Sequence, residues 1–148
     1  MDRRTALSGL TMLAAAAMAG STAAETPLDH EHMHHHGMNN KQALIDSTGN
    51  CMNTGEVCLA HCIMLLGEGD KSMAECATNV NQMLSICRAL HDLAAQQSPY
   101  LPAMARIALD TCKACQDACK QHADKHQECK DCMNSCEVCA KECAKIAA

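Results

Sequence analysis

Four segments of this chain carry cysteines at helical spacing, and this spacing constrains the fold more than any other feature. The 148 residues include 13 cysteines, separated within the segments by 7 and 4, then 11, then 3 and 4, then 3, 4, 3 and 4 residues. Every separation is a sum of threes and fours, which places the residues on one face of an α-helix. The sequence therefore predicts helices that each direct a row of thiols into a common core. The cysteines are Cys51, Cys58, Cys62, Cys76, Cys87, Cys112, Cys115, Cys119, Cys129, Cys132, Cys136, Cys139 and Cys143.

Helix-breaking and capping residues separate these segments. Gly67 is expected to end the first helix and Asp70 to begin the second. Ser98, followed by proline, is expected to begin the third helix, and Asp124 the fourth. Such short connections favour an antiparallel up-down-up-down four-helix bundle, an all-α fold without strands. The predicted helices span residues 41–66, 71–97, 100–122 and 125–146.

The supply of ordinary core residues is too small for a well-packed bundle of this length. The chain has one Tyr and no Phe or Trp. Between Thr111 and Lys145 it has eight cysteines, and Met133 and Val138 are the only larger apolar side chains. A core lined by thiols alone would be underpacked, and each missing buried methylene forfeits about 0.8 kcal/mol. We therefore expect metal ions to fill the core.

The spacing also indicates which metal binds. Zinc sites commonly use thiols on short loops, and an iron–sulfur cluster needs four thiolates at one compact point. Rows of thiols inside continuous helices fit neither pattern. Cu(I) is soft and accepts two or three thiolates, so thiols three or four residues apart form a ladder of low-coordination sites. We expect multiple Cu(I) ions per chain, about one per cysteine where thiolates bridge neighbouring ions.

Disulfides are the alternative use of so many thiols, because small exported proteins often contain them. The odd count of 13 argues against complete pairing. Neighbouring thiols within one helix would also strain the helix or the bond if they were bridged.

The predicted connections place thiols at matching depths in the bundle. Counted from the connection near residue 68, Cys62 matches Cys76 and Cys51 matches Cys87. Counted from the connection near residue 123, the matching pairs are Cys119 with Cys129 and Cys112 with Cys136. At 1.5 Å per residue the sulfurs form a column about 20 Å long.

Both of those connections lie at the same end of an up-down bundle, and that end gathers soft or borderline metal ligands. The ligands are His61, Met64, Met73, His122 and His126. Individually, each could be a surface imidazole or a core gap-filler. Together they predict a mouth through which copper reaches the thiols, because imidazole and thioether hold Cu(I) less tightly than thiolate. The opposite end is expected to be closed by an apolar plug of Leu90, Leu93, Tyr100, Leu101, Ile107 and Leu109.

Residues 1–24 are typical of a twin-arginine export signal. Arg3 and Arg4 precede an Ala-rich apolar run, and small residues up to Ala24 suit cleavage. The apolar run is too short and too Ala-rich to cross about 30 Å of hydrocarbon comfortably. We therefore expect a periplasmic mature protein with no membrane association once the signal is removed.

Residues 25–40 are predicted to form a flexible tail, and residues 41–148 the bundle domain. The tail lacks an apolar period and is either a metal-capturing segment or a solubilising low-complexity one. Its candidate ligands are His30, His32, Met33, His34, His35, His36 and Met38.

Three cysteine-rich motifs resemble those of the bacterial copper storage proteins. They are CLAHC at 58–62, CKACQDAC at 112–119 and CKDCMNSCEVCAKEC at 129–143. The resemblance extends over about residues 43–147 and includes the twin-arginine leader of the exported branch. It implies storage of Cu(I) for copper enzymes outside the cytoplasm, and a homotetramer of four-helix bundles. It also implies loading at an end that bears His and Met, which His61, Met64 and Met73 would supply.

Several function classes find no support in the composition. A net charge of −5 and the near absence of aromatic residues argue against nucleic-acid partners. The CxxC pairs lack the strand-to-helix setting of thioredoxin-like enzymes, and no catalytic grouping stands out, so we do not expect an enzyme. Three hypotheses remain: a high-capacity copper store, a metallochaperone or detoxifying protein that passes copper on, and a disulfide-linked structural protein.

Overall fold

The computed structural model describes residues 36–148, with side chains from Lys41 onward. Four α-helices and one short 3₁₀ helix make up this part of the chain. Their bounds are α1 His36–Gly67, η1 Lys71–Met73, α2 Ala74–Ala95, α3 Leu101–Lys120 and α4 Gln127–Ala147. The predicted export signal and the tail up to residue 35 lie outside the described residues. The predicted boundary at residue 41 is moved by the structure, because α1 already includes residues 36–40.

Three of the four predicted helix boundaries are found close to their expected positions. The first helix ends at Gly67, and Gly69 turns the chain with a φ of +98°, a conformation that favours glycine. The Asp70 carboxylate accepts hydrogen bonds from the Ser72 backbone N–H at 3.0 Å and from its hydroxyl at 2.6 Å. Ser98 accepts a hydrogen bond from the Tyr100 N–H one residue before α3 begins.

The predicted cap at Asp124 is wrong. The N-cap of α4 is His126, whose backbone is extended and whose side chain makes no capping hydrogen bond. Helix-like turns continue past α3, with the Lys125 and His126 N–H groups both donating to the His122 carbonyl at 3.0 Å. The chain therefore becomes extended only at His126, two residues later than predicted.

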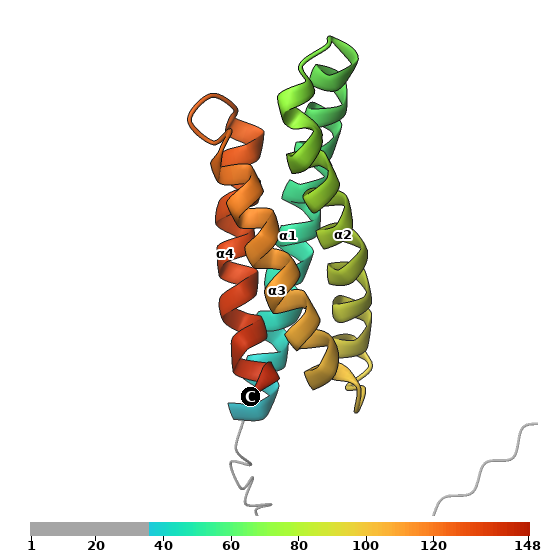
Figure 1. The fold of residues 1–148 in the computed structure, drawn as a ribbon. Helices are drawn as coiled ribbons and strands as arrows, with labels where there is room; N and C mark the ends of the chain where they lie inside the picture. The colour runs from blue at the N-terminus through green and yellow to red at the C-terminus, as the bar shows by residue number, and fades with distance from the viewer. Residues whose placement is uncertain (1–35) are drawn as a thin grey trace, which may run out of the picture. The chain divides into compact units, whose positions relative to one another are not determined.

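The helices form an antiparallel up-down-up-down bundle, as predicted (Figure 1). Within the described residues, α1 packs against α2 and α4, and α3 packs against α2 and α4, without diagonal contacts. Figure 1 shows the α1–α2 and α3–α4 connections together at one end, with the C-terminus and the α2–α3 connection at the other. None of the described helices is long and apolar enough to cross a membrane.

The core runs along the whole bundle and consists mainly of thiols. It also contains small and aliphatic side chains, among them Leu44, Met73, Val80, Met83 and Leu90, all fully buried. The few buried polar side chains are satisfied locally. Thr48, for example, donates to the Leu44 carbonyl at 2.8 Å, one turn earlier in α1. The sequence has few large apolar residues, and in the core thiols occupy many of the positions that such residues would otherwise fill.

Candidate metal centre

Every cysteine of the chain lies in the core as a free thiol with no solvent exposure. The reason is the helical spacing, because residues three and four apart share the face that each helix turns toward its neighbours. In α4 this face includes Cys129, Cys132, Cys136, Cys139 and Cys143, which are all buried. The predicted cysteine-lined core is therefore confirmed.

All the thiols except Cys143 gather in four groups, and within each group the sulfur atoms lie within 4.8 Å of one another. Two groups contain four thiols and two contain three, and neighbouring groups share Cys58 and Cys132. Sharing joins three of the groups, and the fourth is joined to them by the contact between Cys51 Sγ and Cys136 Sγ at 3.6 Å, so the groups form one column. The groups are Cys58, Cys62, Cys76 and Cys129; Cys58, Cys119 and Cys132; Cys115, Cys132 and Cys136; and Cys51, Cys87, Cys112 and Cys139.

Close contacts between cysteine sulfurs join α1 with α4, α2 with α3, and α3 with α4. The shortest contacts between two thiols, at 3.6 Å, connect Cys51 with Cys136 and Cys76 with Cys119. Two pairs lie at 3.8 Å, Cys58 with Cys129 and Cys87 with Cys112, and Cys115 lies 3.9 Å from Cys132. A soft ion that binds two or three thiolates therefore finds its ligands on different helices with little movement.

The observed groups follow the predicted pairing between α1 and α2. Cys62 shares a group with Cys76, and Cys51 shares one with Cys87. Between α3 and α4 the pairing is displaced by one cysteine, since Cys119 is grouped with Cys132 and Cys112 with Cys139. The predicted partners were Cys129 and Cys136. The helix-like turns before His126 shift the register, which the sequence pattern did not indicate.

Hydrogen bonds between the thiols change their pKa values in both directions. Bonds with neighbouring thiols, of which that with Cys115 has the largest effect, lower the pKa of Cys119 to about 6. Similar bonds, led by that with Cys112, lower the pKa of Cys139 to about 5. The bond with Cys139, together with burial, raises the pKa of Cys143 far above its ordinary value. A cysteine with a lowered pKa loses its proton to a soft metal more readily than one with a raised pKa.

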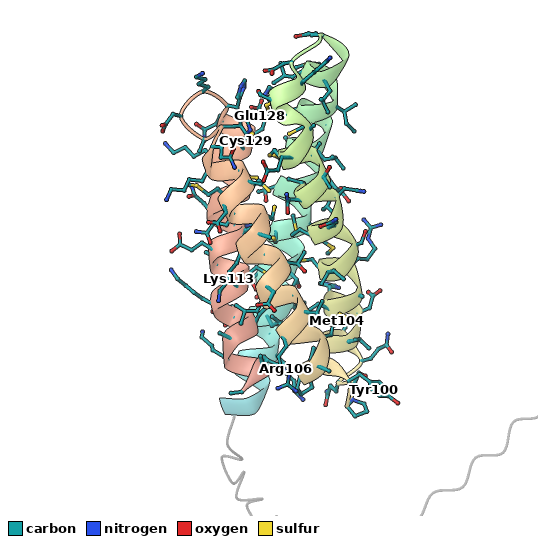
Figure 2. All side chains as sticks on the ribbon, viewed as in Figure 1. Tyr100, Met104, Arg106, Lys113, Glu128 and Cys129 are labelled. Atoms are coloured by element: carbon teal, nitrogen blue, oxygen red, sulfur yellow. The ribbon has the colours of Figure 1, made fainter. Side chains whose placement is uncertain are left out.

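A cluster of imidazoles lies at the end of the bundle that carries the α1–α2 and α3–α4 connections. His61 Nε2 is 2.9 Å from His126 Nδ1, and the His122 ring lies 6.5 Å from the His126 ring between centroids. Glu128 Oε2 lies 3.7 Å from His61 Nε2. Figure 2 shows Glu128 and Cys129 near this end of α4. Because His61 directly precedes Cys62, the cluster adjoins the outermost four-thiol group.

The two methionines predicted at the same end differ in their surroundings. Met73 is fully buried and belongs to the core, whereas the Met64 residue is 52% exposed. A thioether at each position, one inside and one outside, suits a path that leads from solvent to the thiols.

The opposite end is closed by apolar side chains, but not by all those predicted. Leu90 and Leu101 are buried, and Leu93 and Leu109 are partly buried against the core. Tyr100 and Ile107 are mostly exposed, at 72% and 51%, because they lie on the outer face of the bundle. Leu44 of α1 and Ala94 of α2 belong to the same buried cluster instead.

The sequence analysis missed one sulfur of the core. Met83 is fully buried, and its Sδ accepts a hydrogen bond from the Cys51 thiol at 3.4 Å. The sequence pattern could have indicated that Met83 is buried. Residues 76, 80, 83 and 87 are spaced by four, three and four, so Met83 lies on the same face of α2 as its two cysteines. The candidate ligands His30, His32, Met33, His34 and His35 of the tail lie outside the described residues.

The part of the chain that carries the thiols matches a known protein family. A family model described as "Copper storage protein" matches residues 37–148. The chain belongs to the copper storage protein family. The resemblance noted in the sequence is therefore confirmed, and with it the predicted copper storage function.

Solved structures of copper storage proteins share the fold. Apo copper storage protein 3 from Bacillus subtilis is 25% identical with a TM-score of 0.64, covering 73% of this chain and 99% of that one. The Cu(I)-bound copper storage protein BsCsp3 is 23% identical with a TM-score of 0.65, covering 74% and 99%. The copper storage protein from Streptomyces lividans loaded with 10 copper equivalents is 20% identical with a TM-score of 0.68, covering 74% and 84%. A comparison with curated proteins finds no match.

Proposed function

We propose that this protein stores many Cu(I) ions along its column of core thiolates and operates outside the cytoplasm. The observation that carries the proposal is the grouping of its buried free thiols, all but Cys143, with cross-helix sulfur contacts of 3.6–3.9 Å. Thiolates at this spacing can bridge successive soft ions. The ligands proposed for storage are the 13 cysteines.

The His/Met end is proposed as the mouth of the store. His61 is partly open to solvent, with 15% side-chain exposure, and adjoins Cys62 of the outermost thiol group. His126 and His122 extend the imidazole cluster, and Met73 places a thioether in the core near the α1–α2 connection. Weaker ligands at the opening let copper pass inward without being trapped there.

The location and the biological use of the stored copper belong to the same proposal. The twin-arginine pattern of residues 1–24 supports export to the periplasm. There the stored copper would supply copper enzymes, limit copper toxicity, or both. Assembly into a homotetramer is proposed from the resemblance to exported copper storage proteins.

Metal stoichiometry tests the proposal. We expect the reduced protein to bind ten or more Cu(I) ions per chain, on the order of one per cysteine. The measurement is anaerobic titration with Cu(I), with copper and free thiols quantified per chain after gel filtration. Saturation at one or two ions would indicate a metallochaperone, and saturation below about five would contradict storage. A low free-thiol count without copper would favour the disulfide-linked structural alternative.

A further inference from the structure

The thiol rows of α1 and α2 are interrupted at matching positions. In α1 the core-facing residues 51, 55, 58 and 62 are three cysteines and Gly55. In α2 the core-facing residues 76, 80, 83 and 87 are two cysteines, Val80 and Met83. The group Cys115, Cys132 and Cys136 is accordingly built from α3 and α4 alone. The column therefore has a stretch in which α1 and α2 contribute no thiol.

Gly55 and Met83 face each other across this interruption. A Cβ atom added to Gly55 would lie 2.6 Å from the Met83 methyl carbon, closer than such atoms approach in proteins. The glycine therefore makes the space that the Met83 side chain occupies. Met83 therefore places a thioether in the core at this position, where Leu or Val would place only hydrocarbon.

The Met83 sulfur continues the chain of sulfur contacts. Its Sδ lies 3.4 Å from Cys51 Sγ, which in turn lies 3.6 Å from Cys136 Sγ. The contact between thioether and thiol is thus as short as the contacts that join the thiols themselves. A thioether is a soft ligand without charge, so it can bind Cu(I) without first releasing a proton.

We propose that Met83 is a further Cu(I) ligand, which forms a mixed thioether and thiolate site with Cys51 and Cys136 in the interior of the column. The inference rests on the proposed storage function and adds to it one sulfur ligand distinct from the thiols and from the His/Met mouth. Through Cys51 and Cys136 the site connects the group Cys51, Cys87, Cys112 and Cys139 with the group built from α3 and α4.

The competing explanation is that Met83 only fills the space beside Gly55, since Met is a common gap-filler in cores. Met83→Leu separates the two, because leucine has a similar volume and no sulfur. Met104→Leu is the matched control. Met104 is partly buried against the same core in α3, and Figure 2 places it at the apolar end, away from Glu128 and Cys129.

The test compares copper retention in the parent and the two variants after full loading. A chromophoric Cu(I) chelator is titrated against each protein, and circular dichroism of the copper-free proteins checks that all three fold. For Met83→Leu we expect about one copper per chain to be lost at roughly tenfold lower chelator concentration than in the parent. This is the smaller end of the losses of metal affinity seen when residues around a metal site are replaced. Met104→Leu should release copper as the parent does.

A second measurement detects contact between copper and the methionines directly. The parent is labelled with selenomethionine, loaded with Cu(I) and measured by X-ray absorption at the selenium edge. We expect scattering from copper, and we expect labelled Met83→Leu to show less of it than labelled Met104→Leu. Matching retention curves for Met83→Leu and the parent, or selenium without a copper neighbour, would overturn the role of Met83 and leave storage intact. Loading of the parent with fewer than about five ions would refute storage itself.

Discussion

At the scale of single residues, the weaker copper ligands lie near solvent, where copper would enter, and the thiols that would store it lie in the core. His61 and Met64 are open to solvent to different degrees, whereas Cys132 and Cys136 have no exposure. Replacing both His61 and Met64 with Leu should slow Cu(I) loading and leave capacity nearly unchanged, because thioether and imidazole bind Cu(I) more weakly than thiolate. Stopped-flow uptake and chelator competition measure the two quantities.

The matched counterpart of that double variant removes core thiols instead. Replacing Cys132 and Cys136 with Ser should lower capacity by about two ions without slowing the first phase of uptake, since the mouth is intact. Unchanged uptake in the His61 and Met64 variant would contradict the proposed mouth. The tail histidines from His30 to His36 would then become the next candidates.

At the scale of the elements, the connections fix how the thiol rows face each other, and Asp70 stabilises one of them. Its carboxylate accepts two hydrogen bonds from Ser72 at the start of η1. Asp70→Ala should lower the midpoint of urea unfolding of the copper-free protein, because it removes both capping hydrogen bonds. Asp124→Ala is the control, because His126 and not Asp124 caps α4. Equal midpoints of urea unfolding for the two variants would show that the Asp70 cap contributes nothing.

At the scale of the whole molecule, the bundle has two kinds of core, and each contributes to stability under different conditions. The apolar end, with Leu44, Leu90 and Leu101 buried, does not depend on metal. We therefore expect the copper-free protein to be helical. Copper should raise its melting temperature, because a ligand that binds the native state at a hundred times its Kd adds about 2.7 kcal/mol per site. Circular dichroism during heating measures both, and a random-coil spectrum without copper would show that the metal is required for folding.

The all-α bundle, the inward rows of thiols and the end at which His61, His122 and His126 gather could be predicted from the sequence. These features depend on local rules, namely helical spacing and short connections, which act within a few residues. The family resemblance of the cysteine motifs follows from the same local pattern.

Which thiols contact each other, and which other side chains contact them, could not be predicted from the sequence and follows from the packing of the helices. The pairing of Cys112 with Cys139 depends on the extra turns before His126, and the exposure of Tyr100 and Ile107 depends on how the start of α3 packs against the bundle. The contact between Met83 and Cys51 depends on the space left by Gly55, 28 positions earlier in the sequence than Met83. Local spacing fixes the face of a helix that a residue occupies, but the axial register between helices is a property of the packed bundle, and sulfur–sulfur distances follow from that register.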